Sequence, residues 1–307
     1  MKTTCLIVGI PAILSMLACQ KTLTTNAPRP GVHDSVAMID SGAKSPAVDT
    51  AVRPPFPQTA PSAVNACPAL PIYGDSLVYM QPVAGQDAIL TPVNNPGTGK
   101  YYSWPAGMDI DNNTGAIDLT KSETGMKYVI GFVPAGTTDT CLSTLVIGGA
   151  SYYDSAYVVS GGGVKAVPYF DANPAGGSNC DGQGNGSGCS FDVTGSAQEA
   201  SVYVNNSSGE IDLQKTLEGQ SNKAGVFGAN PVDGQTVTAT IYYQLKSGSN
   251  NALEHIDVQF MYYTSSSSIP VGLMNSLNTK LNNLLSGVPI STSANPRPPL
   301  VIITRGR

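Results

Sequence analysis

Asp111-Asn-Asn-Thr-Gly-Ala-Ile-Asp-Leu-Thr-Lys-Ser122 returns 94 positions later as Asn205-Asn-Ser-Ser-Gly-Glu-Ile-Asp-Leu-Gln-Lys-Thr216. In both copies a polar turn and a glycine precede an Ile-x-Leu alternation, the pattern of a tight turn that leads into a strand with one buried face. Gly115 and Gly209 stand where such a turn needs a positive φ, which costs glycine little. The recurrence predicts two copies of one β-rich unit and says little about chemistry.

Composition narrows the class of protein. The chain has 307 residues, which suits two domains of about 100 residues each with additional tails. Only 12% of the residues are charged, while 33 are Gly and 23 are Pro, a balance that favours an all-β, extracellular protein. The net charge is −5 and no basic cluster occurs, so nucleic acid is not expected as a partner.

The amino terminus has the features of a secretory signal peptide. Lys2 supplies the positive start, Leu6 to Leu17 form the apolar run, and Ala18 is a small residue at the cleavage edge, so we expect residues 1–18 to be removed. Ser15-Met-Leu-Ala-Cys19 resembles a bacterial lipobox, with Met16 where Leu is usual. The resemblance implies that Cys19 is lipidated and anchors the chain to a membrane without a spanning helix. The alternative is an ordinary signal peptide with an incidental cysteine.

The segment after Cys19 predicts a disordered stalk over residues 19–66. It is rich in Pro, Ala, Ser, Thr and Asp and contains one aromatic residue, Phe56, so it cannot bury enough apolar surface to offset its ordering entropy. Asp34-Ser-Val and Asp49-Thr-Ala resemble the O-glycosylation acceptors of Bacteroidota. The resemblance implies a cell-envelope location, at the outer membrane or the cell surface.

Short β-strand candidates fill the rest of the chain, and they predict one domain over residues 67–160 and a second over 161–268. The candidates in the first are Ser76–Met80, Asp87–Thr91, Gly115–Leu119, Lys127–Val133, Leu142–Ile147 and Tyr157–Ser160. Those in the second are Ala200–Val204, Gly209–Leu213, Thr236–Leu245 and His255–Tyr263. The last two alternate apolar and polar residues, as expected for a hairpin with one face in the core.

Pro105-Ala-Gly-Met-Asp-Ile-Asp-Asn-Asn-Thr-Gly-Ala-Ile-Asp-Leu119, followed by Gly125-Met-Lys-Tyr-Val-Ile130, resembles the immunoglobulin-like and cadherin-like repeats of bacterial surface proteins. Those families carry an apolar-x-apolar-Asp and Thr-Gly-x-Ile signature before a Gly-x-Tyr strand. The resemblance implies two tandem immunoglobulin-like β-sandwiches and gives no activity.

The sequence of residues 269–307 predicts one helix and one strand after the two domains. Leu residues recur at three- and four-residue spacing between Pro270 and Ser286, which predicts an amphipathic helix, and Leu300-Val-Ile-Ile-Thr304 predicts a terminal strand. The strand either pairs within its own domain or enters a neighbouring chain.

Four cysteines remain after Cys5 and Cys19, and in an exported protein an even number predicts disulfides. Cys180 and Cys189 bracket a short Gly-rich segment that closes easily, so we pair them and leave Cys67 with Cys141.

Candidate ligands and catalytic groups are sparse. Asp109, Asp111, Asn113 and Asp118 offer oxygens for calcium, but the spacing departs from a calcium loop and the carboxylates do not recur in the second copy. Capping of turns by Asx side chains is the alternative. His255 is the only histidine beyond the stalk and stands beside no nucleophile motif. Seven tyrosines lie in or next to predicted strands, either as packing residues or as a platform for sugars; they are Tyr152, Tyr153, Tyr157, Tyr242, Tyr243, Tyr262 and Tyr263.

These features predict a non-enzymatic envelope lipoprotein that acts in adhesion or as a structural or binding module, with glycans or matrix proteins as partners. Two alternatives stay open: a carbohydrate-active hydrolase or accessory binding domain, and a polymerising surface subunit that uses its terminal strand.

Overall fold

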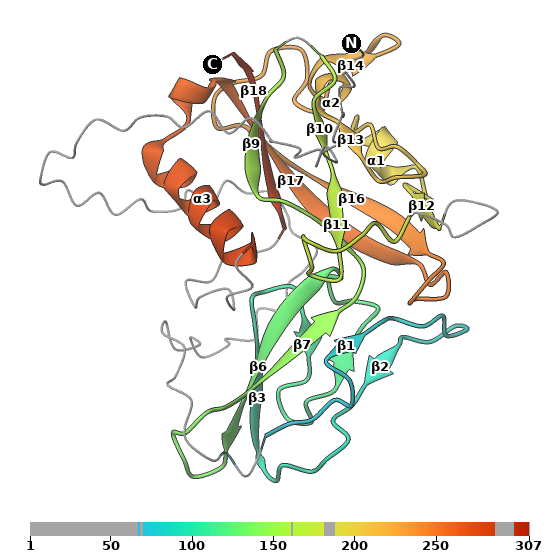
Figure 1. The fold of residues 1–307 in the computed structure, drawn as a ribbon, viewed down its shortest axis with the longest axis vertical. Coiled ribbons are helices and arrows are strands. Elements are labelled where there is room, and N and C mark those ends of the chain that lie inside the picture. The colour runs from blue at the N-terminus through green and yellow to red at the C-terminus, as the bar shows by residue number, and fades with distance from the viewer. Residues whose placement is uncertain (1–66, 68–69, 161, 181–187, 286–297, 307) are drawn as a thin grey trace, which may run out of the picture. The chain divides into compact units, whose positions relative to one another are not determined.

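The computed structural model describes residues 67, 70–160, 162–180, 188–285 and 298–306. The predicted signal peptide, Cys19 and the stalk over 19–66 lie outside these residues. All described residues belong to one compact unit, Ser41–Arg307, and they are mostly β-strand with one long helix (Figure 1). The predicted β-rich class is therefore confirmed.

Residues 67–148, here called the first region, form two small sheets around one core. The strand orders are β3-β6-β7-β1 and β2-β5-β4. The bounds are β1 Leu77–Val78, β2 Ile89–Leu90, β3 Gly99–Trp104, β4 Asp109–Ile110, β5 Ile117–Asp118, β6 Met126–Pro134 and β7 Cys141–Ile147. The core between the sheets contains Ile117 from β5 and Tyr128, Ile130 and Phe132 from β6, none of which has exposed surface. Alternate residues of β6 point inward because side chains alternate along a strand.

Residues 149–306, here called the second region, contain a five-stranded sheet in the order β12-β16-β17-β18-β9. Its strands are β9 Ser155–Val158, β12 Cys189–Phe191, β16 Thr236–Leu245, β17 Glu254–Ser265 and β18 Leu300–Gly306. Shorter strands are β8 Ala150–Tyr152, β10 Lys165–Ala166, β11 Pro168–Phe170, β13 Ile211–Asp212, β14 Gly219–Gln220 and β15 Lys223–Ala224. The helices are α1 Ser196–Glu199, α2 Leu213–Glu218, the 3₁₀ turn Ser266–Ser268 and α3 Val271–Leu285.

The two copies of the repeated stretch fold into the same corner. Asp111 accepts hydrogen bonds from the backbone amides two and three positions later, at 2.9 and 2.7 Å, and Asn205 does the same at 2.9 and 3.1 Å. Gly115 and Gly209 both have a φ of 72°. Each donates its N–H to the carbonyl of that first residue at 2.8 Å. The predicted requirement for glycine is therefore confirmed at both positions.

Aromatic residues hold both corners in the same way. The Tyr73 hydroxyl donates to the carbonyl of the first corner glycine at 2.7 Å, and the Tyr152 hydroxyl donates to that of the second at 2.6 Å. The rings of Tyr101 on β3 and Phe191 on β12 lie against the two glycines. The repeat therefore includes the surroundings of the corner as well as its backbone.

The terminal strand β18 lies in the interior of the five-stranded sheet. It pairs in parallel with β17 on one side and with β9 on the other. Val301, Ile302, Ile303 and Thr304 have no exposed surface. Burial on both faces explains the unbroken apolar run, which is typical of interior parallel strands. The strand thus pairs within its own chain in this structure.

Helix α3 covers the outward face of the sheet at the β9 and β18 side (Figure 1). Leu277 is 2% exposed and packs in one cluster with Tyr263, Leu300 and Ile302. The Leu spacing in the sequence therefore predicted both the helix and its apolar side correctly.

The predicted boundary between residues 160 and 161 is wrong. Ala150, Tyr152 and Val159 belong to the core of the second region. The predicted strand Tyr157–Ser160 overlaps β9, which belongs to the second region because it pairs with β18 from the far end of the chain.

The predicted strands on both sides of the second corner also need correction. In place of the strand at Ala200–Val204, α1 ends in a turn with Ser201 at a φ of 62°, and only Val204 forms a bridge, to Ile211. The strand predicted to reach Leu213 ends at Asp212, whose carboxylate accepts the Lys215 N–H at 3.0 Å and caps α2.

Candidate functional site

The predicted calcium ligands use their oxygens within the first corner. The amides of Thr114 and Asn113 donate to Asp111 and hold the pKa of its carboxyl below the usual range. Asp118 accepts the Lys121 N–H at 3.2 Å and forms an ion pair with the same side chain at 2.6 Å. These contacts are those of Asx turns and caps.

The two remaining candidates do not complete a cation site. Asn113 accepts a hydrogen bond from Lys100 Nζ at 2.5 Å, so its oxygen faces a positive charge. Asp109 lies on the exposed side of β4, opposite Asp118 in register. Within the described ranges, no group of three or more His, Cys, Asp or Glu side chains is placed to hold a metal ion.

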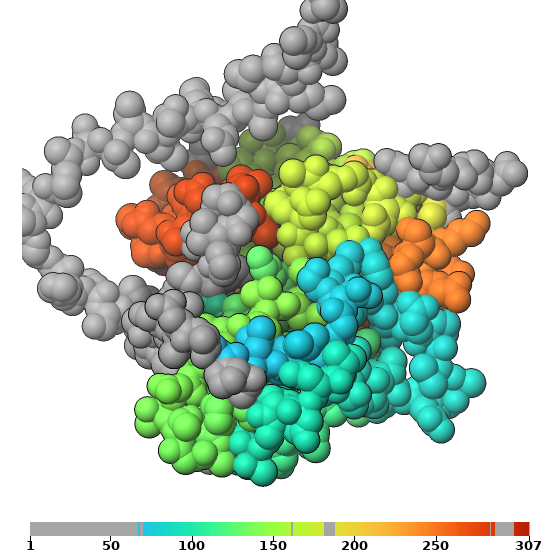
Figure 2. Space-filling view, turned by 60° about the horizontal axis from the view of Figure 1, so that its bottom comes forward, coloured from blue at the N-terminus to red at the C-terminus, as the bar shows by residue number. Residues whose placement is uncertain are grey.

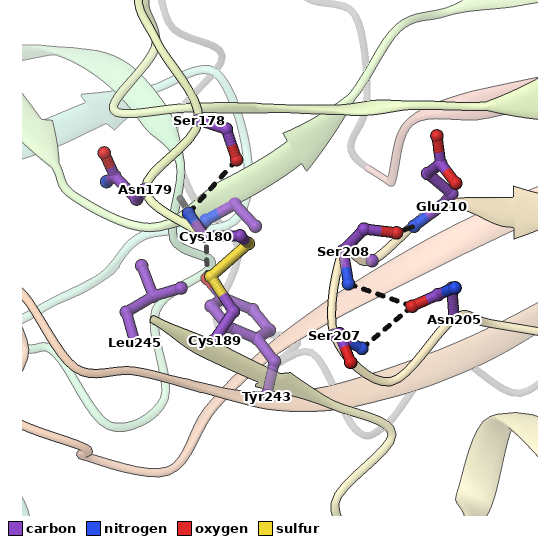
Figure 3. Close-up of a disulfide and its surroundings, with 12 residues drawn as sticks. Ser178, Asn179, Cys180, Cys189, Asn205, Ser207, Ser208, Glu210, Tyr243 and Leu245 are labelled. Carbon is purple, nitrogen blue, oxygen red and sulfur yellow. Dashed lines mark hydrogen bonds between the residues drawn. A yellow bond between two sulfur atoms is a disulfide. The ribbon is translucent and has the colours of Figure 1, made fainter. Parts of the chain in front are cut away.

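Two disulfides join the cysteines paired in the sequence analysis. Cys67 is bonded to Cys141 at the start of β7, with Cα atoms 5.6 Å apart. Cys180 is bonded to Cys189 at the start of β12, with Cα atoms 4.8 Å apart. Figure 3 shows the second disulfide beside Leu245 of β16 and near the corner that begins at Asn205. Each disulfide therefore links two segments of the chain beside one of the two cores.

Most of the seven strand tyrosines are packing residues. Four are buried, namely Tyr152, Tyr243, Tyr262 and Tyr263. Tyr157 is partly exposed and packs against the second core, and the Tyr153 ring lies 4.9 Å from that of Tyr169. Tyr242, on the outward side of β16, is left as the candidate for contact with a ligand.

Tyr242 belongs to a polar surface that we call the hairpin face. It consists of the outward residues of β16 and β17, namely Thr238, Thr240, Tyr242, Gln244, His255, Asp257 and Gln259. Thr238 is exposed and the others are partly exposed, whereas the residues between them on each strand are buried. The alternation of the two strands therefore presents one apolar side to the core and one polar side outward.

The hairpin face is ordered by cross-strand contacts. Tyr242 and His255 are register partners, and their ring centroids lie 5.9 Å apart with a 39° angle between the planes. Thr240 and Asp257 are the next register pair on the same face, and the Thr240 hydroxyl donates to Asp257 at 2.5 Å. The result is an aromatic pair next to a carboxylate and a hydroxyl.

The electrostatics of the hairpin face disfavour anionic partners. Burial lowers the pKa of His255, and the nearby Asp257 carboxylate opposes this only in part. The imidazole is therefore neutral at neutral pH and offers one donor and one acceptor. Asp257 and the net charge of −5 repel anions.

Helix α3 limits the extent of the hairpin face. Met261 and Tyr263, further along β17, pack under α3 together with Leu277. Figure 1 shows α3 beside β9 and β18, while the opposite ends of β16 and β17 extend away from it. The hairpin face is thus the part of the outward surface that α3 leaves uncovered.

A second unusual group lies where the two regions meet. Glu254, the first residue of β17, has no exposed surface, and neither carboxylate oxygen has a hydrogen-bond partner among the described residues. Burial raises the pKa of Glu254 to about 8; Asp171 adds to the rise, and the nearby Ser249 hydroxyl moderates it. The carboxyl is therefore mostly protonated at neutral pH. Sequence reasoning missed this residue, because an isolated Glu at the start of an alternating strand looks like a surface residue.

Polar contacts around Glu254 hold the two regions together. Asp171 accepts the Tyr79 hydroxyl at 2.7 Å and the Gly149 N–H at 2.9 Å. Gln81 donates to the carbonyl of Gly248 at 2.8 Å. Figure 2 shows the orange tip of the β16–β17 hairpin against the blue and cyan surface of the first region.

Tyr243 lies at the centre of this junction. It is fully buried, its hydroxyl shares a hydrogen bond with the Thr124 hydroxyl of the first region, and it accepts the Ala150 N–H at 2.9 Å. The buried polar side chains of the junction thus serve to join the two regions.

Comparisons with known proteins do not assign this chain to a family. No family model and no curated protein matches the chain. Two crystal structures of human protocadherin-24 EC1-2 are weakly similar. One, form II, has a TM-score of 0.20 and 8% identity over 61% of this chain and 93% of that one. The other has a TM-score of 0.21 and 7% identity over 60% and 91%. Among the described helices none is long and apolar enough to cross a membrane.

Proposed function

We propose that the protein is a non-enzymatic lipoprotein of the bacterial cell envelope that carries two immunoglobulin-like β-sandwiches and acts in adhesion as a binding module. In this proposal Cys19 carries the lipid, and residues 19–66 hold the folded part away from the outer membrane or cell surface. The observation that supports binding most directly is the hairpin face, where Tyr242, His255 and Asp257 stand together on the outward side of a well-packed hairpin.

The chemistry of the hairpin face fits a neutral glycan. A tyrosine ring offers an apolar face on which a sugar ring stacks, and it loses little entropy because it has only two χ angles. Thr240, Gln244 and Asp257 supply hydroxyl, amide and carboxylate groups that match the hydroxyls of a sugar. The neutral imidazole of His255 adds a donor and an acceptor without attracting anions.

The rigidity of the support also favours binding. Ile241 and Tyr243 on β16 and Ile256 on β17 have no exposed surface and fix the strand that carries each outward residue. A site on packed strands holds its side chains in place before a ligand arrives, which lowers the entropy cost of binding.

Binding is tested with the purified chain against neutral and anionic glycans and against matrix proteins. We expect a neutral glycan to bind, and Tyr242→Ala to weaken that binding at least about tenfold because the stacking surface is lost. Tyr102→Ala is the matched control, since Tyr102 is also a partly exposed strand tyrosine but belongs to β3 of the first region. The melting temperature of both variants is measured alongside.

Three results would count against this proposal. Binding that survives both Tyr242→Ala and His255→Ala would show that the hairpin face is not the contact surface. A matrix protein as the only ligand would replace the glycan by a protein partner. Release of sugars from any substrate by the wild-type chain, absent from a mock purification, would show an enzyme.

The lipid anchor has its own test. Cells that express the chain are fed a fatty-acid analogue, and we expect label on the wild-type protein and none on Cys19→Ala. An unlabelled wild-type chain would refute lipidation and leave the binding proposal unaffected.

A further inference from the structure

Each region has an aromatic pair across two neighbouring strands beside its corner glycine, and this shows which strands correspond. Tyr101 on β3 is the register partner of Phe132 on β6, and Phe191 on β12 is the partner of Tyr243 on β16. The ring centroids are 4.7 Å apart in the first pair and 5.2 Å in the second. Tyr101 and Phe191 also contact the two corner glycines. β6 therefore corresponds to β16.

The correspondence continues into the next strand. Phe132 faces Cys141 on β7, and Tyr243 faces Glu254 on β17. Val146 on β7 and Gln259 on β17 lie five residues after Cys141 and Glu254, respectively. In the first region Val146 is paired with Leu77 of β1, whereas in the second Gln259 is paired with Leu300 of β18. β18 thus occupies the place beside β17 that β1 occupies beside β7.

The true counterpart of β1 is β9. Tyr73 and Tyr152 make the same hydroxyl bond to the two corner glycines, and β1 begins four residues after Tyr73 while β9 begins three residues after Tyr152. β1 is parallel to β7 and pairs with it directly. β9 is also parallel to its sheet, but β18 separates it from β17. The second region is therefore the arrangement of the first with one strand inserted.

The first region shows what the sheet forms without an inserted strand, namely a direct parallel pair. β9 and β17 already run in the same direction, so they are able to pair directly if β18 leaves. A sheet whose strands can be hydrogen-bonded in two alternative arrangements is bistable. Strand exchange between copies arises from elements of this kind.

We propose that the place between β9 and β17 is a strand-acceptor site that takes Leu300–Gly306 from a second copy of this chain, so that copies join by exchanging β18. The site needs apolar side chains on both faces of one strand: Val301 and Ile303 fill the main core, and Leu300 and Ile302 pack under α3. The carboxyl-terminal segment of another copy supplies that pattern.

The length of the connection allows the exchange. Residues 286–299 separate the end of α3 from the start of β18. Fourteen residues in extended form span up to about 46 Å, enough to reach a neighbouring copy. Exchange also requires no new kind of contact, because the strand pairs that β18 would form between two copies are those that it forms within one copy.

Exchange is tested with two variants that each add one cysteine, Ala156→Cys and Ile302→Cys, both in the full chain with Cys5→Ala and Cys19→Ala so that no other free thiol remains. Ala156 on β9 and Ile302 on β18 are register partners. The two proteins are mixed at high concentration, held in mild denaturant, returned to buffer and oxidised. We expect an abundant disulfide-linked heterodimer on a non-reducing gel, because exchange between copies holds the two new thiols side by side.

The control mixture combines Ala156→Cys with Thr238→Cys, whose exposed thiol lies on β16 and is not paired with β9. We expect at least about tenfold less heterodimer from this mixture. The chain that carries both Ala156→Cys and Ile302→Cys is expected to close within itself and to stay monomeric. Heterodimer no more abundant in the test mixture than in the control overturns the proposal. The glycan assay is independent of this result, because the hairpin face does not include β18.

Discussion

At the scale of single residues, Glu254 is the group most at odds with its surroundings. A carboxyl with no exposed surface and no hydrogen-bond partner among the described residues avoids the cost of a buried charge by staying protonated. The titratable groups that act on it or feel its charge are Asp171, Tyr79 and Tyr243. None of them is a cation, so among the described residues only the nearby Ser249 hydroxyl favours the ionised form of Glu254, and it does not offset the effect of burial.

Glu254 is expected to make stability fall as pH rises. Its pKa rises from 4.5 to about 8 on folding, so between these values the native state holds a proton that the unfolded state has lost. The unfolding free energy therefore decreases as the pH rises from 4.5 to about 8. Below this window the stabilisation that Glu254 contributes is fully present. At ~1.4 kcal/mol per pKa unit the effect is at most about 5 kcal/mol. Glu254→Gln should remove this decrease.

Urea unfolding at about pH 5 and about pH 9 measures the effect as the difference between the wild type and Glu254→Gln. Glu218→Gln, at an exposed carboxylate of α2, controls for the loss of a carboxylate in general. Parallel pH profiles of the wild type and Glu254→Gln would show that Glu254 ionises as easily in the folded chain as in the unfolded one.

At the scale of elements, the corner turns are the best-specified parts of the chain. Both glycines have a φ of 72°, and a Cβ built on them would lie 2.5 Å from the Tyr101 ring at Gly115 and 2.6 Å from the Phe191 ring at Gly209. A substitution there strains the backbone and displaces a buried ring, two costs that add. Gly136 has a φ of 79° with nothing within 4 Å, so only the backbone cost applies.

Gly115→Ala and Gly209→Ala are therefore expected to destabilise by about 3 kcal/mol or more, and Gly136→Ala by about 1 kcal/mol. Chemical unfolding of the three variants gives these differences. Equal losses at all three positions would mean that the rings move aside freely and that the corners are held by backbone conformation alone.

Strands were predictable where one face is buried and the other is not. β16 was expected at Thr236–Leu245 and has those bounds, because its residues alternate strictly between core and surface. β3 at Gly99–Trp104 was missed, since its aromatic residues Tyr101, Tyr102 and Trp104 occupy both parities and blur the alternation. Ala200–Val204 alternates in sequence but belongs to a helix end and a turn.

At the scale of the whole molecule, the two regions are joined through Tyr243. Tyr243→Phe keeps the ring and removes the hydroxyl, which leaves the Thr124 hydroxyl and the Ala150 N–H buried without this partner. Each such loss costs about 1–3 kcal/mol, so we expect the two losses to cost about 2–6 kcal/mol in total. We also expect the wild type to unfold in one transition and Tyr243→Phe in two, because the two cores of the variant are less strongly coupled.

Calorimetry and urea unfolding with two probes show whether the transitions coincide. Tyr242→Phe, one residue away on the outward side of β16, is the matched control and should change stability by less than about 1 kcal/mol. A Tyr243→Phe chain that unfolds in one transition with wild-type stability would show that apolar packing alone couples the regions.

The sequence by itself determined the local features of this protein: the two corners, the β-rich class, the long hairpin, the helix with its apolar side and the pairing of the cysteines. Most of these depend on residues close together in the chain or on a period of two or 3.6 residues, and the Cys67–Cys141 pair follows by elimination once Cys180 is paired with Cys189. Only the tertiary structure decided that β18 lies between β9 and β17, that Glu254 is buried and that Tyr242 and His255 share a face with Asp257. These depend on which distant segments pair, and a one-dimensional pattern does not carry that information, because the apolar run Leu300–Thr304 predicts a buried strand without indicating its neighbours.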